Sequence, residues 1–289
     1  MSSVQPRRSA LYMPASNSRA IEKAKGLSCD VVVLDLEDSV LPEAKLAARE
    51  AAIAAVRSGG FGRREVVIRV NALETPWGAD DLAAASTVGP DAVLVPKISS
   101  AADVIAADRS LAAAPHGTRL WVMIETCQAI LALAEIASAA KETRLSAFVM
   151  GINDLAKEMG ARMTADRAPF RAALSLAVTA ASGAGLTALD GVHNEIEDLA
   201  ALEAVCVQGR DFGFDGKSLI HPSHLEICNR IFSPDPADVA WGRVVIAAFD
   251  APENVGKGAL RVEGRLAERL HYDQAVRLVA IAEVIEAAG

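Results

Sequence analysis

Apolar and polar positions alternate along the chain in two patterns, short apolar runs and longer stretches with helical spacing. The run VVVLDL (31–36) is an example of the first, and a strand that is apolar on both faces must be covered on both. The stretch 42–57 is an example of the second, with Pro42 suited to a first helical turn. The apolar runs predict strands at 9–13, 31–36, 65–70, 91–95, 120–124, 145–150, 186–190 and 211–215. The helical spacing predicts helices at 42–57, 79–87, 100–109, 127–140, 168–183 and 194–207.

Eight apolar strands separated by helices predict a closed (β/α)₈ TIM barrel of the α/β class, with a parallel sheet. No G-x-G-x-x-G follows the first strand, which counts against an open dinucleotide-binding sheet. The barrel is expected to be the catalytic domain over residues 1–232. Residues 233–289 are expected to form a C-terminal helical extension or lid, with a helix at 238–249, a loop at 250–260 and a final helix at 264–287.

Composition narrows the class of protein. The 289 residues are 52% hydrophobic and only 4% aromatic, and their formal charge of −8 argues against nucleic acid or anionic lipid as a partner. No apolar run approaches the roughly 20 residues needed to cross a bilayer, and no signal peptide is expected. The four cysteines lie far apart without metal-ligand spacing and suit free thiols. A cytoplasmic enzyme without a membrane segment is therefore expected.

Charged side chains follow several of the apolar strands. In a TIM barrel the reactive groups project from the carboxyl ends of the strands, so these charges are expected to meet at one pocket. They include Asp35, Arg69, Glu125 and Asp154. Each also suits a structural role when taken alone: Asp38 or Asp154 could cap the next helix, and Arg69 could form a structural ion pair.

Glu125 and Asp154 follow neighbouring strands, as two oxygen ligands of one hard cation must. Two carboxylates, with water and substrate oxygens in the other positions, are typical of Mg²⁺. No pair of histidines stands at comparable positions, which makes Zn²⁺ the weaker interpretation. Arg69 offers a planar fork for a substrate carboxylate.

Two acidic residues after the second strand are interpreted as supporting groups rather than metal ligands. Glu37 and Asp38 are expected to lie beside the metal pocket, where they would accept hydrogen bonds from water around the ion or orient Arg69. Lys97 is expected to be an electrostatic helper. A Schiff-base role for this lysine is disfavoured, because a metal ion would already supply the electron sink.

Several motifs, in order along essentially the whole chain, resemble the citrate lyase β-subunit-like branch of the HpcH/HpaI aldolase family. They are RRSALYMPASNSRAIEKAKGLSCDVVVLDLEDSVLPEAKLAAR, VIRVNALETPWGADDL, GPDAVLVPKI, IETCQAIL, GINDLAKEMG, ALDGVHNEIEDL, GFDGKSLIHPSHL and GRLAERLHYDQAVRLV. The resemblance implies a Mg²⁺-dependent carbon–carbon lyase on a (β/α)₈ barrel, with Glu125 and Asp154 as metal ligands and Arg69 on the substrate carboxylate.

The resemblance also assigns substrate contacts. It implies that the backbone near Asn153 contacts the acid and that Tyr12 and Lys23 contact acyl-CoA, with Arg19 as a basic neighbour. The segment 217–221 is expected to line the thioester end.

One departure from the family pattern concerns the acid/base group. Many relatives carry a G-K-M-[IV]-D segment that supplies an aspartate to a neighbouring subunit, whereas this chain reads GRLAERL. Glu268 holds the aspartate position and is the candidate general acid/base, with Glu263 a weaker one; as an alternative, Glu268 is a solvated helix residue. The family implies a homotrimer or a dimer of trimers.

The expected function is reversible cleavage of a 3-hydroxyacyl-CoA, such as malyl-CoA or citramalyl-CoA, into acetyl-CoA and a 2-oxo acid. Three alternatives stay open at this point. The chain could be a citrate lyase subunit acting on an acyl-carrier-protein thioester, a thioesterase that releases CoA and a hydroxy acid, or a non-catalytic barrel.

Overall fold

The computed structural model describes residues 5–287. Within them, eight parallel strands form a closed barrel in sequence order, with the first strand pairing with the eighth. The predicted α/β TIM barrel is therefore confirmed. The strands are β1 (Ser9–Pro14), β2 (Val31–Asp35), β3 (Glu65–Arg69), β4 (Ala92–Val95), β5 (Arg119–Ile124), β6 (Leu145–Met150), β7 (Thr187–Asp190) and β8 (Gly216–Leu219).

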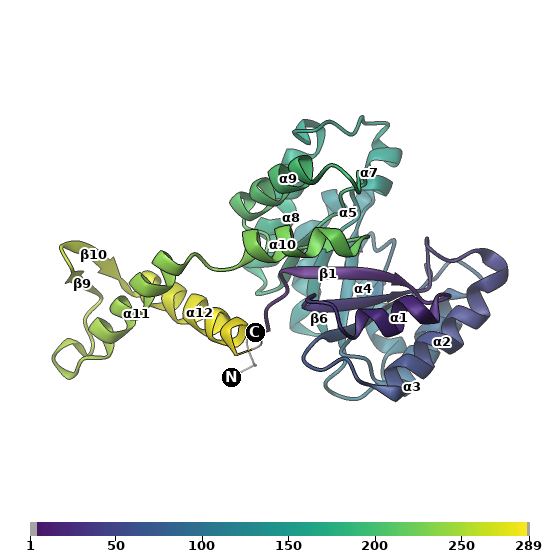
Figure 1. Ribbon diagram of the computed structural model, residues 1–289, viewed down its shortest axis with the longest axis horizontal. Coiled ribbons are helices and arrows are strands. Elements are labelled where there is room, and N and C mark those ends of the chain that lie inside the picture. The colour runs from purple at the N-terminus through teal and green to yellow at the C-terminus, as the bar shows by residue number, and fades with distance from the viewer. Residues whose placement is uncertain (1–4, 288–289) are drawn as a thin grey trace. The chain divides into compact units, whose positions relative to one another are not determined.

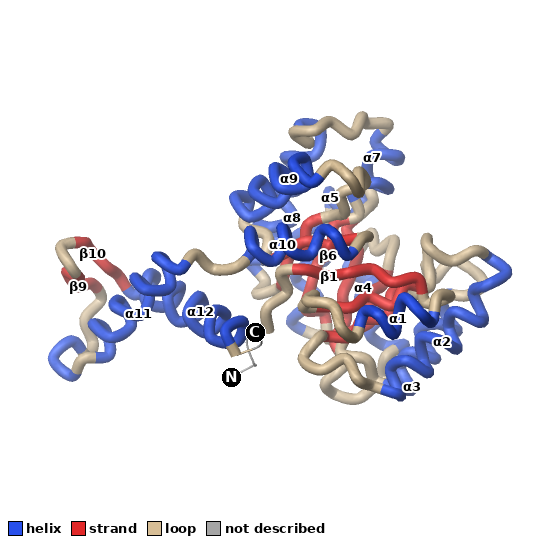
Figure 2. Tube along the Cα trace, viewed as in Figure 1, coloured by secondary structure: helices blue, strands red, loops and turns tan. Residues whose placement is uncertain are grey.

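Helices follow the strands and surround the barrel (Figures 1 and 2). None of the helices in the described chain is long and apolar enough to cross a bilayer. The helices of the barrel region are α1 (Ser18–Ala24), α2 (Lys45–Ser58), α3 (Gly78–Val88), α4 (Ala101–Ser110), α5 (Cys127–Leu131), α6 (Leu133–Ser138), α7 (Ile152–Met159), α8 (Arg171–Gly183), α9 (Leu199–Phe212) and α10 (Leu225–Phe232).

The strands bury apolar side chains on both faces, as their sequences require. One face packs inside the barrel, where Trp121 is the largest member of a cluster of small and branched side chains. The other face packs against the surrounding helices in a larger core. Successive residues of a strand point to opposite faces, so the continuous apolar runs are explained by burial on both sides.

Polar contacts close the amino-terminal end of the barrel. The Arg7 guanidinium donates to both carboxylate oxygens of Glu65, at 2.6 and 2.7 Å, and to the Thr187 hydroxyl at 2.7 Å. It also lies 5.0 Å from the centre of the Trp121 ring. Since Glu65 begins β3 and Thr187 begins β7, this arginine joins opposite sides of the barrel.

The expected positions of the eighth strand and the helix before it are wrong. The stretch 211–215 is the end of α9 and the turn after it, because the helix runs to Phe212 and ends at Gly213, where φ is 95°. The strand is instead the polar sequence GKSL, which has no apolar run to mark it. Likewise α9 begins after the cap residue Asp198 rather than at 194, and the expected helix 127–140 is divided at Ala132 into α5 and α6.

The structure divides into two compact units: Arg7–Phe232 form one, and residues 5–6 together with those from Ser233 onward form the other. The unit from Ser233 onward contains α11 (Pro236–Asp250), a hairpin of β9 (Ala259–Val262) and β10 (Arg265–Glu268), and α12 (Arg269–Glu286). The expected loop 250–260 is present between Asp250 and Ala259, with one short 3₁₀ turn in it, but the expected helix start at 264 is wrong, because Glu263 and Gly264 form a two-residue hairpin turn at φ 45° and 84°. Positive φ at both turn positions is typical of tight hairpins. α11 packs on α12 through Val245, Phe249 and Ala275.

Candidate active site

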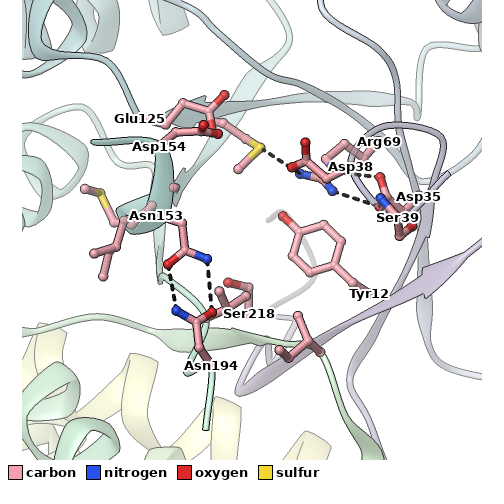
Figure 3. A pocket seen from close by; sticks show the side chains of 16 residues that line it. Tyr12, Asp35, Asp38, Ser39, Arg69, Glu125, Asn153, Asp154, Asn194 and Ser218 are labelled. Atoms are coloured by element: carbon pink, nitrogen blue, oxygen red, sulfur yellow. Dashed lines mark hydrogen bonds and ion pairs between the residues drawn. The ribbon is translucent and has the colours of Figure 1, made fainter. Parts of the chain in front are cut away.

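A cavity of about 290 Å³ lies at the carboxyl ends of the barrel strands (Figure 3). It brings together side chains from seven of the eight βα units. The sequence analysis expected them in one pocket only because functional groups of TIM barrels lie at the carboxyl ends of the strands. The polar residues that line it are Tyr12, Asp35, Asp38, Ser39, Arg69, Glu125, Asn153, Asp154, Asn194 and Ser218. The apolar ones include Met123, Met150, Ile152, Val192 and Ile220.

Glu125 and Asp154 form a carboxylate pair at one side of the cavity (Figure 3). Glu125 directly follows β5 and is buried, whereas Asp154 lies in the first turn of α7 and its side chain is 36% exposed. The Lys97 ammonium nitrogen lies 3.2 Å from Glu125 Oε1 and 2.6 Å from Asp154 Oδ2. The two carboxylates therefore converge on one cationic group.

The pair differs in its affinity for protons. Burial raises the pKa of Glu125 to about 7, against the lowering effect of Lys97. Burial also opposes ionisation of Asp154, but the hydrogen bond from Lys97 holds the pKa of Asp154 below its usual range. Lys97 was expected to be an electrostatic helper, and the structure places its charge directly on both carboxylates.

Gly151 makes room for the buried carboxylate. A Cβ at this position would lie 2.4 Å from Glu125 Oε2 and 2.5 Å from Glu125 Cβ, far inside van der Waals contact. Oε2 is a buried oxygen without a hydrogen-bond partner in the described structure. A buried carboxylate oxygen without a partner is costly unless a ligand supplies one.

These observations fit a divalent cation. The carboxylates of Glu125 and Asp154 converge, one of their oxygens has a free lone pair, and a positive group already lies between them. Hard oxygen donors of this kind suit Mg²⁺, which keeps several water or substrate ligands. Among residues 5–287 no cluster of three or more histidine, cysteine or acidic side chains suited to a metal occurs, so water and substrate would supply the remaining ligands of an ion held by Glu125 and Asp154.

Arg69 lies across the cavity from this pair and is held by Asp35. The register of β2 and β3 places the two residues side by side, and two hydrogen bonds of 2.6 and 2.8 Å join the guanidinium to both oxygens of Asp35. Such a bidentate contact fixes the plane of the guanidinium. Burial opposes the charge on Asp35, but the Arg69 guanidinium holds the pKa of that carboxyl below its usual range.

Glu37 and Asp38 also lie beside Arg69. Asp38 Oδ2 accepts a hydrogen bond of 3.1 Å from Nη1, while Glu37 Oε2 lies 2.9 Å from the same nitrogen without hydrogen-bond geometry. Burial raises the pKa of Glu37 to about 8, with Arg69 acting in the opposite direction. Because the effect of burial is larger than that of Arg69, Glu37 favours its protonated form at neutral pH.

Tyr12 and an amide pair complete the cavity. The Tyr12 ring stacks against Arg69, with 4.7 Å between the guanidinium carbon and the ring centre, and its hydroxyl points into the cavity (Figure 3). This hydroxyl is buried without a partner, and burial raises its pKa. Asn153 and Asn194 exchange two hydrogen bonds of 3.0 and 2.9 Å between their side-chain amides. Unpaired polar atoms that face a cavity are positions where a ligand can bond.

Other expected site residues lie elsewhere. Lys23 is exposed on α1 and Arg19 is exposed beside it, and neither lines the cavity. Lys217, in the segment expected at the thioester end, turns away from the cavity and pairs with Asp190 at 3.0 Å, whereas Ser218 and Ile220 line it.

The expected acid/base group belongs to the second unit. Glu268 ends β10, is exposed and stands at the cap position of α12, where its backbone N–H donates to His271 Nδ1 at 2.9 Å. Its expected role in the site stays a prediction.

Sequence reasoning placed Asp35 at the pocket but not its contact with Arg69, and it missed two further residues that shape the site. Asp35, rather than Glu37, makes the two-point contact with Arg69, and strand register was the signal that could have found it. Lys45 donates to the carbonyl oxygens of Leu36 and Glu37, at 2.8 and 2.7 Å, and so holds the acidic loop after β2. Asn194 lies in the loop after β7 and had no pattern to mark it.

The chain belongs to the HpcH/HpaI aldolase/citrate lyase family, whose model matches residues 8–222. This match spans all eight strands and the loops that line the cavity. The family identified from the sequence motifs is therefore confirmed.

Relatives named for two different activities match almost the full chain. A (3S)-malyl-CoA thioesterase of Cereibacter sphaeroides is 46% identical over 98% of this chain and 96% of that protein. An L-malyl-CoA/beta-methylmalyl-CoA lyase of the same species is 31% identical over 98% of this chain and 96% of its own length. The structure of the Mycobacterium tuberculosis protein CitE in complex with magnesium, acetoacetate and coenzyme A is 30% identical, with a TM-score of 0.74 over 98% of this chain and all of that one.

Proposed function

We propose that the protein is a Mg²⁺-dependent thioesterase that hydrolyses short 3-hydroxyacyl-CoA esters carrying a second carboxylate, such as (3S)-malyl-CoA. The observation that carries the proposal is the difference in similarity between the two kinds of relative. The thioesterase is 46% identical and the lyase 31% identical over the same 98% of the chain. This favours the hydrolytic alternative over the cleavage expected from the sequence motifs.

The cavity supports a small anionic substrate. Arg69 would bind its free carboxylate, because Asp35 fixes the guanidinium plane and leaves Nη1 directed to Asp38, a residue whose side chain is 69% exposed and able to move aside. The Tyr12 hydroxyl and the Asn153 amide would contact the hydroxyacyl portion. Binding in this partly enclosed cavity strengthens each of these interactions by excluding water.

Glu125 and Asp154 would hold Mg²⁺ at the other side of the cavity. When bound, the ion would act as a Lewis acid that polarises a substrate oxygen. Glu125 is fixed for this role, since Gly151 and the Lys97 N–H position its carboxylate. The distance between the two ends of the cavity would thus select acids with a carboxylate on one side and an oxygen substituent on the other.

Glu268 would supply the general base that takes a proton from the attacking water. The carbonyl carbon of the thioester gains the water oxygen, the carbon–sulfur bond breaks, and the thiol of CoA leaves with a proton. The family pattern places this group in a neighbouring subunit, so we propose a homotrimer or a dimer of trimers. Large exposed apolar side chains in the second unit, Val255, Leu266 and Leu270, suit burial in such an assembly.

Carbon–carbon cleavage is the second candidate function. It is supported by the lyase at 31% identity, whose length is matched almost completely, and by a site that would suit a 3-hydroxyacyl-CoA equally well. In this reaction the hydroxyl group of the substrate would lose its proton to solvent as it becomes the carbonyl of the 2-oxo acid, and the bond between that carbon and the carbon next to the thioester would break. Glu268 would protonate the carbon of the departing acetyl-CoA enolate, and the 2-oxo acid would stay between Arg69 and the metal ligands.

Product analysis separates the two functions. The protein is incubated with (3S)-malyl-CoA and with citramalyl-CoA in the presence of Mg²⁺, and free thiol, hydroxy acid, 2-oxo acid and acetyl-CoA are measured. Thiol with malate or citramalate, without any 2-oxo acid or acetyl-CoA, is the expected result. Acetyl-CoA with an equal amount of glyoxylate from malyl-CoA or of pyruvate from citramalyl-CoA, or condensation of acetyl-CoA with glyoxylate, pyruvate or oxaloacetate, would establish the lyase instead.

The carboxylate pair is tested in the same assay. Glu125→Gln and Asp154→Asn are each expected to lower turnover at least about a hundredfold, because each removes one of two protein ligands of the ion. Glu135→Gln, which changes an exposed residue of α6, is the matched control and should leave turnover unchanged. Full activity of the wild type in EDTA would refute the metal-dependent mechanism.

A further inference from the structure

Lys97 has an unusual backbone conformation beside the carboxylate pair. It lies two residues after β4 with φ at 58°, in the left-handed region that long side chains rarely adopt. Its N–H donates to Glu125 Oε1 at 2.9 Å, and its ammonium nitrogen lies 3.2 Å from the same oxygen. A residue keeps such a backbone conformation only where the surrounding contacts fix it. At Lys97 this conformation directs the side chain back toward Glu125.

The same ammonium group joins the second carboxylate. Nζ lies 2.6 Å from Asp154 Oδ2, so one positive charge stands between two negative ones. Without it the carboxylates would repel each other across a site in which Glu125 is buried. When both carboxylates are ionised, the one positive charge leaves the group with a net charge of −1, and Glu125 Oε2 is left without a partner in the described structure.

We propose that Lys97 is a built-in counter-ion that holds Glu125 and Asp154 together in the absence of a divalent cation, and that a divalent cation displaces its ammonium group from the pair. A divalent cation neutralises both carboxylates by itself. Adding the lysine would leave an excess positive charge in a partly buried site, where like charges are poorly screened. The Lys97 side chain is 34% exposed and can move toward solvent, whereas Glu125 cannot. The inference rests on the use of Mg²⁺ in the proposed function, but it concerns binding of the ion and not the reaction.

Removal of the lysine charge tests the displacement directly. Binding of MgCl₂ alone is measured by titration calorimetry for the wild type, Lys97→Met, Lys97→Arg and Lys141→Met. Lys97→Met is expected to tighten Mg²⁺ binding about tenfold, because the ion no longer competes with a cation. Lys97→Arg keeps the charge and should bind like the wild type. Lys141 is exposed and precedes β6 at the opposite end of the barrel, so Lys141→Met is the matched control.

The outcomes distinguish this inference from the proposed function. Equal or weaker Mg²⁺ binding by Lys97→Met overturns the counter-ion role and leaves the metal-dependent function in place. If none of the four proteins binds Mg²⁺, both the counter-ion role and the metal-dependent function are overturned. In the metal-free state, Lys97→Met is also expected to unfold at a lower temperature than the wild type, with a larger stabilisation by Mg²⁺.

A second measurement uses the wild type and does not depend on folding of a variant. Lysines are labelled with an amine-reactive acetylating reagent in EDTA and in saturating Mg²⁺, and the modified positions are measured by mass spectrometry. Displacement predicts that labelling of Lys97 rises several-fold with Mg²⁺ while that of Lys141 stays constant. Unchanged labelling of Lys97 at a Mg²⁺ concentration that calorimetry shows to be saturating overturns the inference.

Discussion

Glu125 illustrates how one residue depends on its neighbours for a chemical role. Its carboxylate is buried, yet one oxygen is held by the backbone and side chain of Lys97 while the other faces a space created by a missing Cβ at Gly151. A glutamate after a strand is common, and this local arrangement is what supports the proposed role of Glu125 as a metal ligand. At this scale the most informative tests change a neighbour rather than the residue itself.

Gly151→Ala is expected to displace the Glu125 carboxylate. The added methyl group would meet Glu125 at 2.4–2.5 Å, so the free energy of unfolding should fall by about 1–3 kcal/mol and Mg²⁺ binding should be weakened at least about tenfold. Gly117→Ala is the matched control, because a Cβ at that position would have no neighbour within 4 Å. Urea unfolding and calorimetry with MgCl₂ check both effects. Equal Mg²⁺ affinities in the two variants would contradict this account of the site.

Glu37 is expected to make stability depend on pH. Burial raises the pKa of Glu37 to about 8 in the folded protein, against an ordinary value of 4.5, so the folded state binds more protons than the unfolded state between these values. The stabilisation is complete below about pH 4.5 and is lost as pH rises toward 8. From pH 5 to 8 the free energy of unfolding should therefore fall by on the order of 3 kcal/mol from this group.

Urea unfolding in EDTA at several pH values measures this effect. Glu37→Gln should flatten the decline, since the amide does not titrate, whereas Glu43→Gln, at an exposed position, should keep it. If the free energy of unfolding falls equally with pH for the wild type and Glu37→Gln between pH 5 and 8, the burial of Glu37 does not raise its pKa.

At the scale of elements, the loop after β7 depends on a buried group of charges between the sheet and the helices. Asp190 ends β7 and accepts hydrogen bonds from Arg167, at 2.7 and 2.8 Å, and from Lys217 of β8, at 3.0 Å. Lys217 also donates to the Gly191 carbonyl. These contacts fix the start of the loop that brings Asn194 to the cavity.

Asp190→Ala is expected to lower the free energy of unfolding by about 3–5 kcal/mol, because it leaves two buried cations without a counter-charge. Asp211→Ala removes an exposed partner of Arg210 and should change stability by less than about 1 kcal/mol. Chemical denaturation of both variants tests the comparison. A similar small change in both would mean that water or rearrangement compensates the loss of Asp190.

The elements that sequence predicted well are those with a periodic apolar pattern. β2, β3 and β6 were anticipated within a residue or so, and with them the meeting of Arg69, Glu125 and Asp154 at one end of the barrel. β8 could not be found this way, because its polar side chains are satisfied by contacts with β7 rather than by apolar packing. The contact of Asp35 with Arg69 and the turn at Lys97 depend on strand register and on a strained φ, which no local pattern encodes.

At the scale of the whole molecule, the residues assigned to the proposed reaction belong to two units with separate cores. The barrel unit holds every residue of the cavity, whereas Glu268 belongs to the unit formed by α11, α12 and the β9–β10 hairpin. A site completed by a neighbouring subunit would couple activity to assembly. Size-exclusion chromatography with light scattering is expected to give a trimer or a hexamer.

Glu268→Gln is expected to lower kcat at least about a hundredfold with little change in KM, because it removes a proton carrier rather than a binding group. Glu253→Gln changes another exposed glutamate of the same unit and is the matched control. Steady-state kinetics with the active CoA ester measure both. Wild-type turnover in Glu268→Gln would return this residue to the role of a solvated helix cap.

The polar closure at the amino-terminal end of the barrel has a consequence for how such proteins diversify. Arg7, Glu65 and Thr187 join β3 and β7 at the end of the barrel remote from the cavity, so these contacts do not involve the side chains that line it. Exposed positions in the loops around the cavity, unlike Gly151 or Asp190, can then be substituted without loss of this closure. A descendant could exchange carbon–carbon bond cleavage for hydrolysis, or accept a different acid, while the closed end stays intact.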